Sequence, residues 1–107
     1  MNEHQIQEAA VSCVTQLWPG VGLRELRSHC KEMHLVWARW VFAHLLIREA
    51  ALSRRIVIDL VNWRSGSTLV SALKALDCEC AQNRKRAQQL VDAVTLFRQL
   101  LQKRRAA

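Results

Sequence analysis

Residues 34–51 are apolar at almost every position, and this stretch restricts the possible folds more than any other feature. Its longest apolar part, Leu35 to Ile47, is interrupted by Arg39 and His44 and is too short to span a bilayer. A helix that is apolar nearly all round is buried on most of its sides. We therefore expect a central helix here, in a protein with no membrane partner.

The composition favours helices for the rest of the chain as well. The 107 residues include only three Gly, one Pro and no Tyr, whereas Ala, Leu, Arg and Gln are plentiful. A chain of this length with half of its residues apolar buries one core rather than two. The sequence thus predicts an all-α fold with a single domain over residues 1–107, a compact bundle of about six helices.

Apolar residues at spacings of three and four place the other helices. The expected ranges are 4–18, a short helix at about 22–30 with Leu23 and Leu26 inward, 34–51, 53–61, 65–76 and about 81–103. The last helix carries an expected packing stripe of Ala87, Leu90, Val91, Val94, Phe97 and Leu101. Ser53 is a good N-cap for the fourth helix. The run 56–58 is β-branched, but no second strand exists to pair with it.

The helices 53–61 and 65–76 are separated by a short turn, which predicts a helix-turn-helix. Ser65 or Gly66 opens the second helix, and its outer face carries Ser67, Thr68, Ser71 and Lys74. Small hydroxyl residues at the head of a helix leave its backbone N–H groups open to a phosphate. The second helix is therefore the candidate recognition helix.

The charge of the chain favours a polyanionic partner. Sixteen Lys and Arg against nine Asp and Glu give a net charge of +7. Between Ser53 and Arg86 there are seven cations and three acids. Such an excess attracts nucleic acid over roughly a Debye length, about 8 Å at physiological salt. The alternative is that these side chains only solvate the outer faces of helices.

The segment "SRRIVIDLVNWRSGSTLVSALKAL" resembles the C-terminal DNA-binding domain (domain IV) of the bacterial replication initiator DnaA. The motif of that family, S-L-P-x-I-G-x-x-F-G-x-R-D-H-[ST]-T-V-x-x-A-x-[KR]-x-[IL], aligns without a gap at Ser53, Val57, Val61, Arg64, Ser67, Thr68, Leu69, Ala72, Lys74 and Leu76. Upstream, "VGLRELRSHCK" is similar to the family's short helix and basic loop, and "ARWVFAHLLIREAALS" to its long central helix. The resemblance implies a helical domain akin to the Trp repressor.

The resemblance also implies roles for individual residues. Lys31 corresponds to the basic loop that enters the minor groove, and Arg39 to a phosphate contact, although Arg39 alternatively extends outward from a buried helix. Ser67 and Thr68 correspond to the hydroxyl pair at the head of the recognition helix. Ala72 and Lys74 correspond to groove and phosphate contacts, although Ala72 also suits close helix packing. The full set of expected DNA-binding residues is Lys31, Arg39, Arg54, Arg55, Arg64, Ser65, Ser67, Thr68, Ser71, Ala72 and Lys74.

The chain departs from the motif where the family reads bases. The Asp-His pair is Ser65-Gly66 here, and Gly has no side chain for base contacts. The Leu-Pro after the capping Ser is Arg54-Arg55, which adds two charges, and the turn carries Trp63, a large apolar residue. We therefore expect affinity for DNA to be kept and sequence specificity to be lowered or redirected.

Other chemistries have little support in the sequence. No phosphate-binding glycine loop, nucleophile elbow or useful His-carboxylate pair occurs, so we expect no enzyme, nucleotide or cofactor. Four Cys without a secretion signal predict reduced thiols in a cytoplasmic protein. A zinc site is a minor alternative, because the spacing of its residues matches no standard zinc-binding pattern. Its candidate ligands are His29, Cys30, His34, Cys78 and Cys80.

Two functions follow from these observations. The first is a nucleoid-associated protein that binds double-stranded DNA and regulates replication initiation or transcription, with replication-initiation or phage regulatory proteins as possible partners. The second is a helical protein-interaction module that kept the initiator-like fold and lost base reading. Its expected anchor is one of Trp18, Trp37, Trp40 and Trp63.

Overall fold

The computed structural model describes residues 2–106, which form six α-helices and one π-helical turn with no strand among them. The elements are α1 (Glu3–Leu17), α2 (Leu23–Arg27), α3 (Met33–His44), η1 (Leu45–Glu49), α4 (Arg54–Val61), α5 (Gly66–Gln82) and α6 (Arg84–Ala106). The all-α prediction is confirmed, and the fourth helix is a helix rather than a strand. Within residues 2–106, no helix has the length and apolarity needed to cross a membrane.

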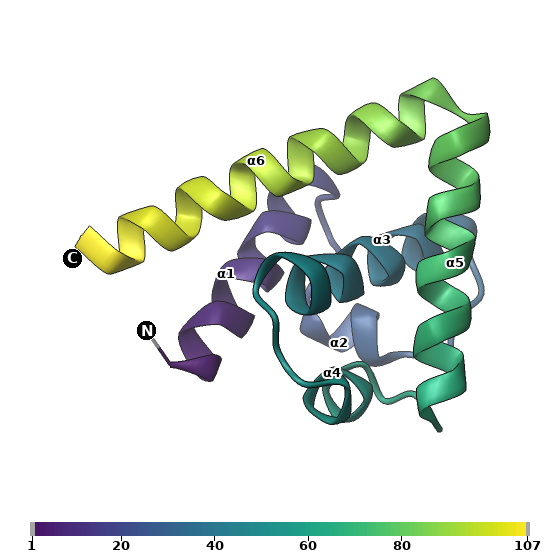
Figure 1. The fold of residues 1–107 in the computed structure, drawn as a ribbon, viewed down its shortest axis with the longest axis horizontal. Helices are drawn as coiled ribbons and strands as arrows, with labels where there is room; N and C mark the ends of the chain where they lie inside the picture. Colours follow the sequence, from purple (N-terminus) through teal and green to yellow (C-terminus); the bar gives the residue numbers. More distant parts are fainter. Residues whose placement is uncertain (1, 107) are drawn as a thin grey trace.

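Helix α3 lies at the centre of the molecule, as its apolar sequence predicts. Its side chains Trp37, Val41 and Phe42 are fully buried, and Leu45 and Leu46 of η1 continue the same core. Helices α1 and α5 flank α3, and α6 runs along one side from the end of α5 to beyond α1 (Figure 1). The apolar stretch is therefore enclosed by the surrounding helices, which removes it from water.

Local signals in the sequence explain where several helices begin and end. The Asn2 side chain accepts from the backbone N–H of Gln5 at 2.9 Å, and the Gln5 side chain accepts from the backbone N–H of Asn2 at 3.2 Å. This capping box satisfies two N–H groups that the helix itself leaves unpaired. The Ser53 hydroxyl accepts from the N–H of Ile56 at 3.3 Å, so the predicted N-cap of α4 is confirmed.

The boundary between the last two helices differs from the prediction. Helix α5 continues through Cys78 and Cys80 to Gln82, and α6 begins only at Arg84. The residues after Leu76 contain no Gly or Pro, so nothing in them stops the helix. The break falls at Asn83, whose extended backbone ends α5 and whose side chain accepts from the N–H of Arg86 at 3.1 Å.

The central helix also ends differently from the continuous helix predicted over 34–51. Its last turn widens into η1, where the N–H of Ala50 reaches the carbonyl of Leu45 at 3.0 Å. Ala51 then adopts a left-handed conformation with φ of 56°. The hydrogen bond of this wider turn encloses one residue more than that of an α-helix. The side chains after it therefore point in other directions than they would in a continuous α-helix.

Two residues placed on inward faces are exposed instead. Leu23 on α2 is 37% exposed and Val91 on α6 is 56% exposed. Only Ala93 and Phe97 of α6 are fully buried, and the other α6 residues that pack against the core are partly buried: Leu90, Val94, Leu96, Leu100 and Leu101. Leu26 on α2 is fully buried, as predicted. The second helix is also shorter than expected, since only Leu23–Arg27 is helical.

Candidate nucleic-acid interface

Helices α4 and α5 are joined by a turn at residues 62–65, at the position where the sequence predicts a helix-turn-helix. Asn62 adopts the left-handed conformation, with φ of 63°, which ends α4 and reverses the chain. Asn tolerates this region better than most residues with a side chain. Arg27 of α2 secures the end of α4, because its Nη1 donates to the carbonyls of Asp59 and Leu60 at 3.0 and 2.9 Å.

The head of α5 presents its hydroxyls to solvent. Ser67, Thr68 and Ser71 are exposed, whereas Leu69 and Leu76 face the core. Ser65 is the N-cap residue but its side chain does not cap the helix; its Oγ lies 2.9 Å from the Oγ of Ser67. The predicted outer face of the candidate recognition helix is therefore confirmed. Its first backbone N–H groups have no side-chain acceptor from the cap.

Four cations around this helix pair have no ion-pair partner in the part of the chain that the structure describes. Arg54 and Arg55 begin α4, Arg64 lies in the turn, and Lys74 lies on the outer face of α5. All four are exposed, and none forms an ion pair with any residue in the described range 2–106. Asp59 is the one acid between Ser53 and Lys74. Their charge is therefore not neutralised locally.

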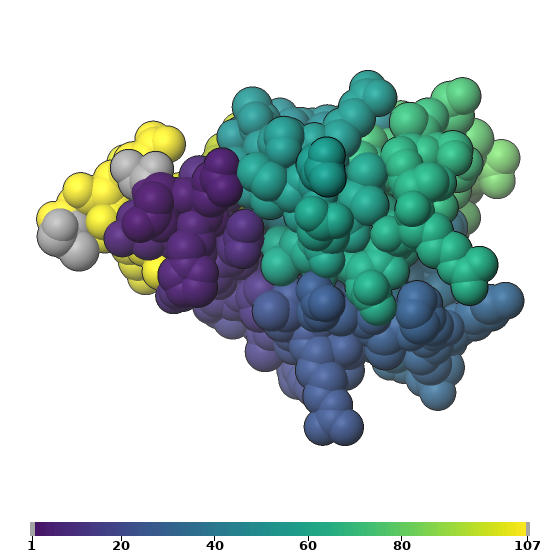
Figure 2. All heavy atoms as spheres, turned by 90° about the horizontal axis from the view of Figure 1, so that it is seen from below, coloured from purple at the N-terminus to yellow at the C-terminus, as the bar shows by residue number. Residues whose placement is uncertain are grey.

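The loop between α2 and α3 lies against the turn of the helix-turn-helix. The Asn62 amide nitrogen is 3.5 Å from Nε2 of His29 in that loop. Figure 2 shows α2 and the segment after it, in blue, adjoining α4 and the start of α5, in teal and green. Lys31 is exposed on this loop and has no ion pair among residues 2–106. The predicted basic loop and the predicted recognition helix thus share one face.

The structure gives Arg39 a different role from the phosphate contact predicted for it. Arg39 is only 7% exposed. Its guanidinium donates to four acceptors in α2 and the following loop: the carbonyls of Leu26 at 3.1 Å, Cys30 at 2.6 Å and Glu25 at 3.3 Å, and the Oγ of Ser28 at 2.9 Å. Burial lowers the pKa of Arg39 from its ordinary value. The side chain fastens α2 to α3 instead of reaching outward.

Ala72 also differs from the expected groove contact, because it is 6% exposed and forms part of a wall. A hollow of about 310 Å³ opens between α3 and α5, with Ala72 in its lining. Trp40 of α3 and Trp63 of the turn line the same hollow and are half-buried. Trp37, in contrast, is fully buried and cannot anchor a partner.

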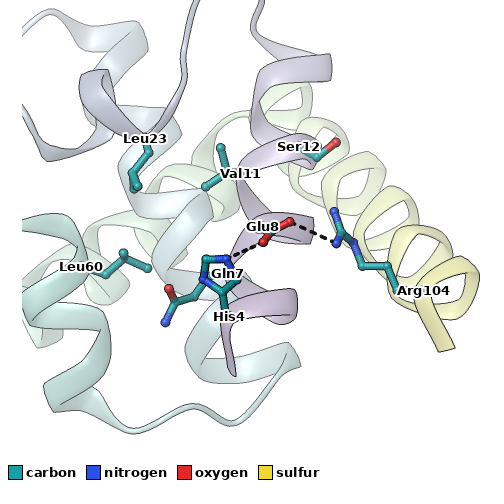
Figure 3. Close-up of a pocket in the computed structure, with 8 residues that line it drawn as sticks. All are labelled: His4, Gln7, Glu8, Val11, Ser12, Leu23, Leu60 and Arg104. Atoms are coloured by element: carbon teal, nitrogen blue, oxygen red, sulfur yellow. Dashed lines mark hydrogen bonds and ion pairs between the residues drawn. The ribbon is translucent and has the colours of Figure 1, made fainter. Parts of the chain in front are cut away.

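A second hollow, of about 340 Å³, lies between α1, α4 and the end of α6 (Figure 3). Leu60 and Leu23 form part of its wall, with His4, Glu8 and Arg104 at its edge. The Glu8 carboxylate lies 2.6 Å from Nε2 of His4 and 3.4 Å from Nη1 of Arg104. The cation at this edge is paired, unlike the cations of the helix-turn-helix.

The cysteines do not form the zinc site considered as an alternative. Within residues 2–106, no three His, Cys, Asp or Glu side chains are close enough to hold a metal ion together. All four cysteines are free thiols, as predicted. Cys13 is buried and donates to the carbonyl of Ala93 at 3.2 Å, and burial raises the pKa of this thiol to about 12.

Comparisons of the chain with protein-family models, with curated proteins and with solved structures found no match.

Proposed function

We propose that this chain binds double-stranded DNA through α4 and α5, with the first half of α5 in the major groove. The observation that carries the proposal is a group of exposed cations on α4, on the turn after it and on α5, none of which forms an ion pair within residues 2–106: Arg54, Arg55, Arg64 and Lys74. Cations without internal partners are free to displace the counterions of phosphates, which is the main source of affinity for DNA.

Each part of the site has a physical task in this proposal. Ser67 and Thr68 offer hydroxyls, and the adjacent N–H groups of α5 offer donors, to phosphate oxygens at the edge of the groove. Arg54 and Arg55 meet the backbone from the start of α4. Lys31 extends the contact from the neighbouring loop toward the next groove. Arg39 joins α3 to α2 and its loop, and Ala72 lines the hollow beside α5.

The proposed binding distinguishes only weakly between base pairs by their hydrogen-bonding groups. The outer face in the first half of α5 carries Ser67, Thr68, Ser71 and Lys74, and Gly66 has no side chain. Bidentate base contacts are made by Arg, Lys, Asn and Gln, and each contributes about 1–3 kcal/mol of discrimination. Of these residue types the face has one Lys. We therefore expect phosphate contacts to supply most of the affinity.

The cellular role that we propose rests on the resemblance to the initiator's DNA-binding domain. Occupying duplex DNA at such a site is suited to regulating replication initiation or transcription, and to a location on the nucleoid. Replication-initiation or phage regulatory proteins are the partners that fit this role. The DNA-binding step can be tested without knowing the process.

Fluorescence anisotropy on a random duplex and on a duplex with initiator boxes, each at two salt concentrations, tests the proposal. We expect binding to both, with similar affinity and a steep salt dependence. The variant Arg54→Ala/Arg55→Ala is expected to bind more weakly at low salt and to reduce the salt slope by about two, because each phosphate contact contributes about 0.9.

The variant Lys103→Ala/Arg105→Ala is the matched control, since it removes the same charge from the exposed end of α6. That end lies on the opposite side of the molecule from α5 (Figure 1). If both variants weaken binding equally, the attraction is a general effect of net charge and the proposed site is wrong. If neither duplex binds at low salt, the protein-interaction module becomes the better interpretation.

A further inference from the structure

The hollow between α3 and α5 adjoins the outer face of the proposed recognition helix. Helix α5 contributes residues at spacings of three and four along one side, so the hollow follows the helix for about two turns. Its walls come from three separate segments that the fold brings together. Its lining includes Arg39 and Trp40 of α3, Trp63 of the turn, and Thr68, Ala72 and Ala75 of α5.

The walls of the hollow are apolar and its flanks are cationic. Trp40, Trp63 and Ala75 supply indole and methyl surface, and the guanidinium of Arg39 is already held by carbonyls of α2 and its loop. Arg64 follows Trp63 in the chain and Lys74 precedes Ala75, and both are exposed without an ion pair in residues 2–106. This combination complements an apolar group carried on a polyanion.

Duplex DNA presents one apolar group in its major groove. The C5-methyl of thymine projects there, and Ala, the Thr methyl and aromatic side chains are its usual contacts. The face of α5 has hydroxyls and methyls but little capacity for bidentate hydrogen bonds. Apolar contact is therefore the form of base recognition for which this surface is best equipped.

We infer that the hollow between α3 and α5 receives the C5-methyl groups of thymine, so that the protein prefers duplexes rich in 5-methylpyrimidines. The inference rests on the proposed DNA binding, and it names the base feature that this site reads. Thr68 and Ala75 lie about two turns apart on α5, so they contact different methyl groups along the hollow, and Trp40 and Trp63 form its opposite wall. Water released from these apolar surfaces supplies the preference.

Replacing every thymine of an A·T-rich duplex with deoxyuridine removes the methyl and leaves the phosphates and hydrogen-bonding edges in place. We expect the uracil duplex to bind about fourfold more weakly for each methyl that the hollow receives, the factor for one buried methyl or methylene group. A G·C duplex with 5-methylcytosine is expected to bind more tightly than the same duplex with cytosine. Anisotropy at a fixed salt concentration measures both ratios.

Filling the hollow tests where the preference arises. Ala75→Leu is expected to abolish the difference between the thymine and uracil duplexes. Ala81→Leu is the matched control, because Ala81 is exposed on the same helix and does not line the hollow. Circular dichroism melting of both variants shows whether each is folded.

A second pair of variants tests the hollow without changing the packing around Ala75. Thr68 is exposed, so neither replacement disturbs the core. Thr68→Val keeps the methyl and is expected to retain the preference, whereas Thr68→Ser removes the methyl and is expected to reduce it. The reverse order would assign the effect to the hydroxyl and overturn the inference.

The outcomes separate this inference from the proposed function. Equal affinity of the wild-type protein for thymine and uracil duplexes overturns the inference and leaves DNA binding intact. Absence of binding to any duplex overturns the proposed function, and the inference with it. A preference for thymine that survives Ala75→Leu in a folded protein also overturns the inference, because the hollow is then not its source.

Discussion

The cations of this protein behave differently at the helix-turn-helix and at the junction of η1, α5 and α6. At the junction, Arg48 binds Asp77 through two hydrogen bonds of 2.7 and 2.9 Å, and Arg98 lies 2.8 Å from Glu49. Around the helix-turn-helix, no such partner lies within the described residues for any of four cations: Arg54, Arg55, Arg64 and Lys74. One region uses its cations to join helices, and the other leaves them free.

The difference teaches that net charge alone does not locate an interface. Paired cations produce little field beyond their own partners, because the opposite charge is a few ångströms away. Unpaired cations on one face add their fields and attract a polyanion from a distance. The unpaired cations repel one another, and this repulsion lowers the stability of the folded state to some extent. The following changes test this division, in order of decreasing effect on stability.

Arg39→Ala is expected to have the largest effect, a loss of about 3 kcal/mol in the free energy of unfolding, because carbonyls in α2 and its loop lose a charged donor. Arg39→Lys restores only part of this, since one ammonium cannot reach all the acceptors that the guanidinium reaches. Chemical denaturation measures both, with Arg24→Ala, an exposed residue of α2, as control. If Arg39→Ala leaves the stability unchanged and weakens DNA binding, Arg39 contacts phosphate, as the sequence predicted.

Arg48→Ala is expected to cost about 0.5–1 kcal/mol at neutral pH, because both partners are partly exposed and solvent screens the pair. The hydrogen bonds from Arg48 hold the pKa of Asp77 below its ordinary value of 3.8. A carboxyl with a lowered folded-state pKa stabilises the protein above the unfolded-state pKa. This contribution is therefore present above about pH 4 and is lost as the pH falls through the folded-state value.

Asp77→Asn, which keeps the shape of the side chain, serves as the control for this pair. Urea denaturation at several pH values measures the contribution, and the difference between wild type and Asp77→Asn is expected to shrink at the acid end. A difference that does not depend on pH would show that the pair contributes through packing and not through charge.

His44 is expected to give a smaller, acid-sensitive contribution. Its side chain is 12% exposed, and burial, with the nearby charge of Arg48, lowers its pKa from 6.5, while Glu49 and Asp77 partly oppose this. The unfolded state then binds more protons below pH 6.5, so stability falls as the pH drops from about 6.5 toward the lower folded-state pKa. His44→Gln is expected to flatten the stability profile between pH 7 and the acid limb. An unchanged profile would contradict this assignment.

Arg54→Ala/Arg55→Ala is expected to have the smallest effect, within about 0.5 kcal/mol of wild type, because exposed side chains without partners contribute little to stability. Thermal melting monitored by circular dichroism checks this at the salt concentrations used for DNA binding. A clear loss of stability would mean that these residues serve the fold, and would remove the contrast between the two regions.

Much of the fold follows from local sequence signals. The apolar stretch 34–51 predicted the central helix, Ser53 predicted the start of α4, and the spacing after Gly66 predicted which side of α5 faces solvent. These features depend on residues within one or two turns of each other, so periodicity and capping are enough to find them. The end of α5 and the start of α6 were missed because Asn83 is a weak stop signal.

The candidate site was predicted in part. The exposure of Ser67, Thr68 and Lys74 followed from the helical spacing, and Lys31 reached the same face through the loop that contacts Asn62. The hollow was not predicted, because its walls come from α3, the turn and α5, which are distant in sequence. Trp40 and Trp63, which line the hollow, were predicted only as possible anchors for a protein partner.

The sequence by itself determined that this protein is helical, which segments form the helices, and that cations surround a helix headed by hydroxyls. The tertiary structure decided which cations are free. Arg39, Arg48 and Arg54 are chemically identical, and only packing sets how many acceptors lie within reach of each guanidinium. The physical reason is that solvation and pairing depend on distances across the fold, which neighbours along the chain do not specify.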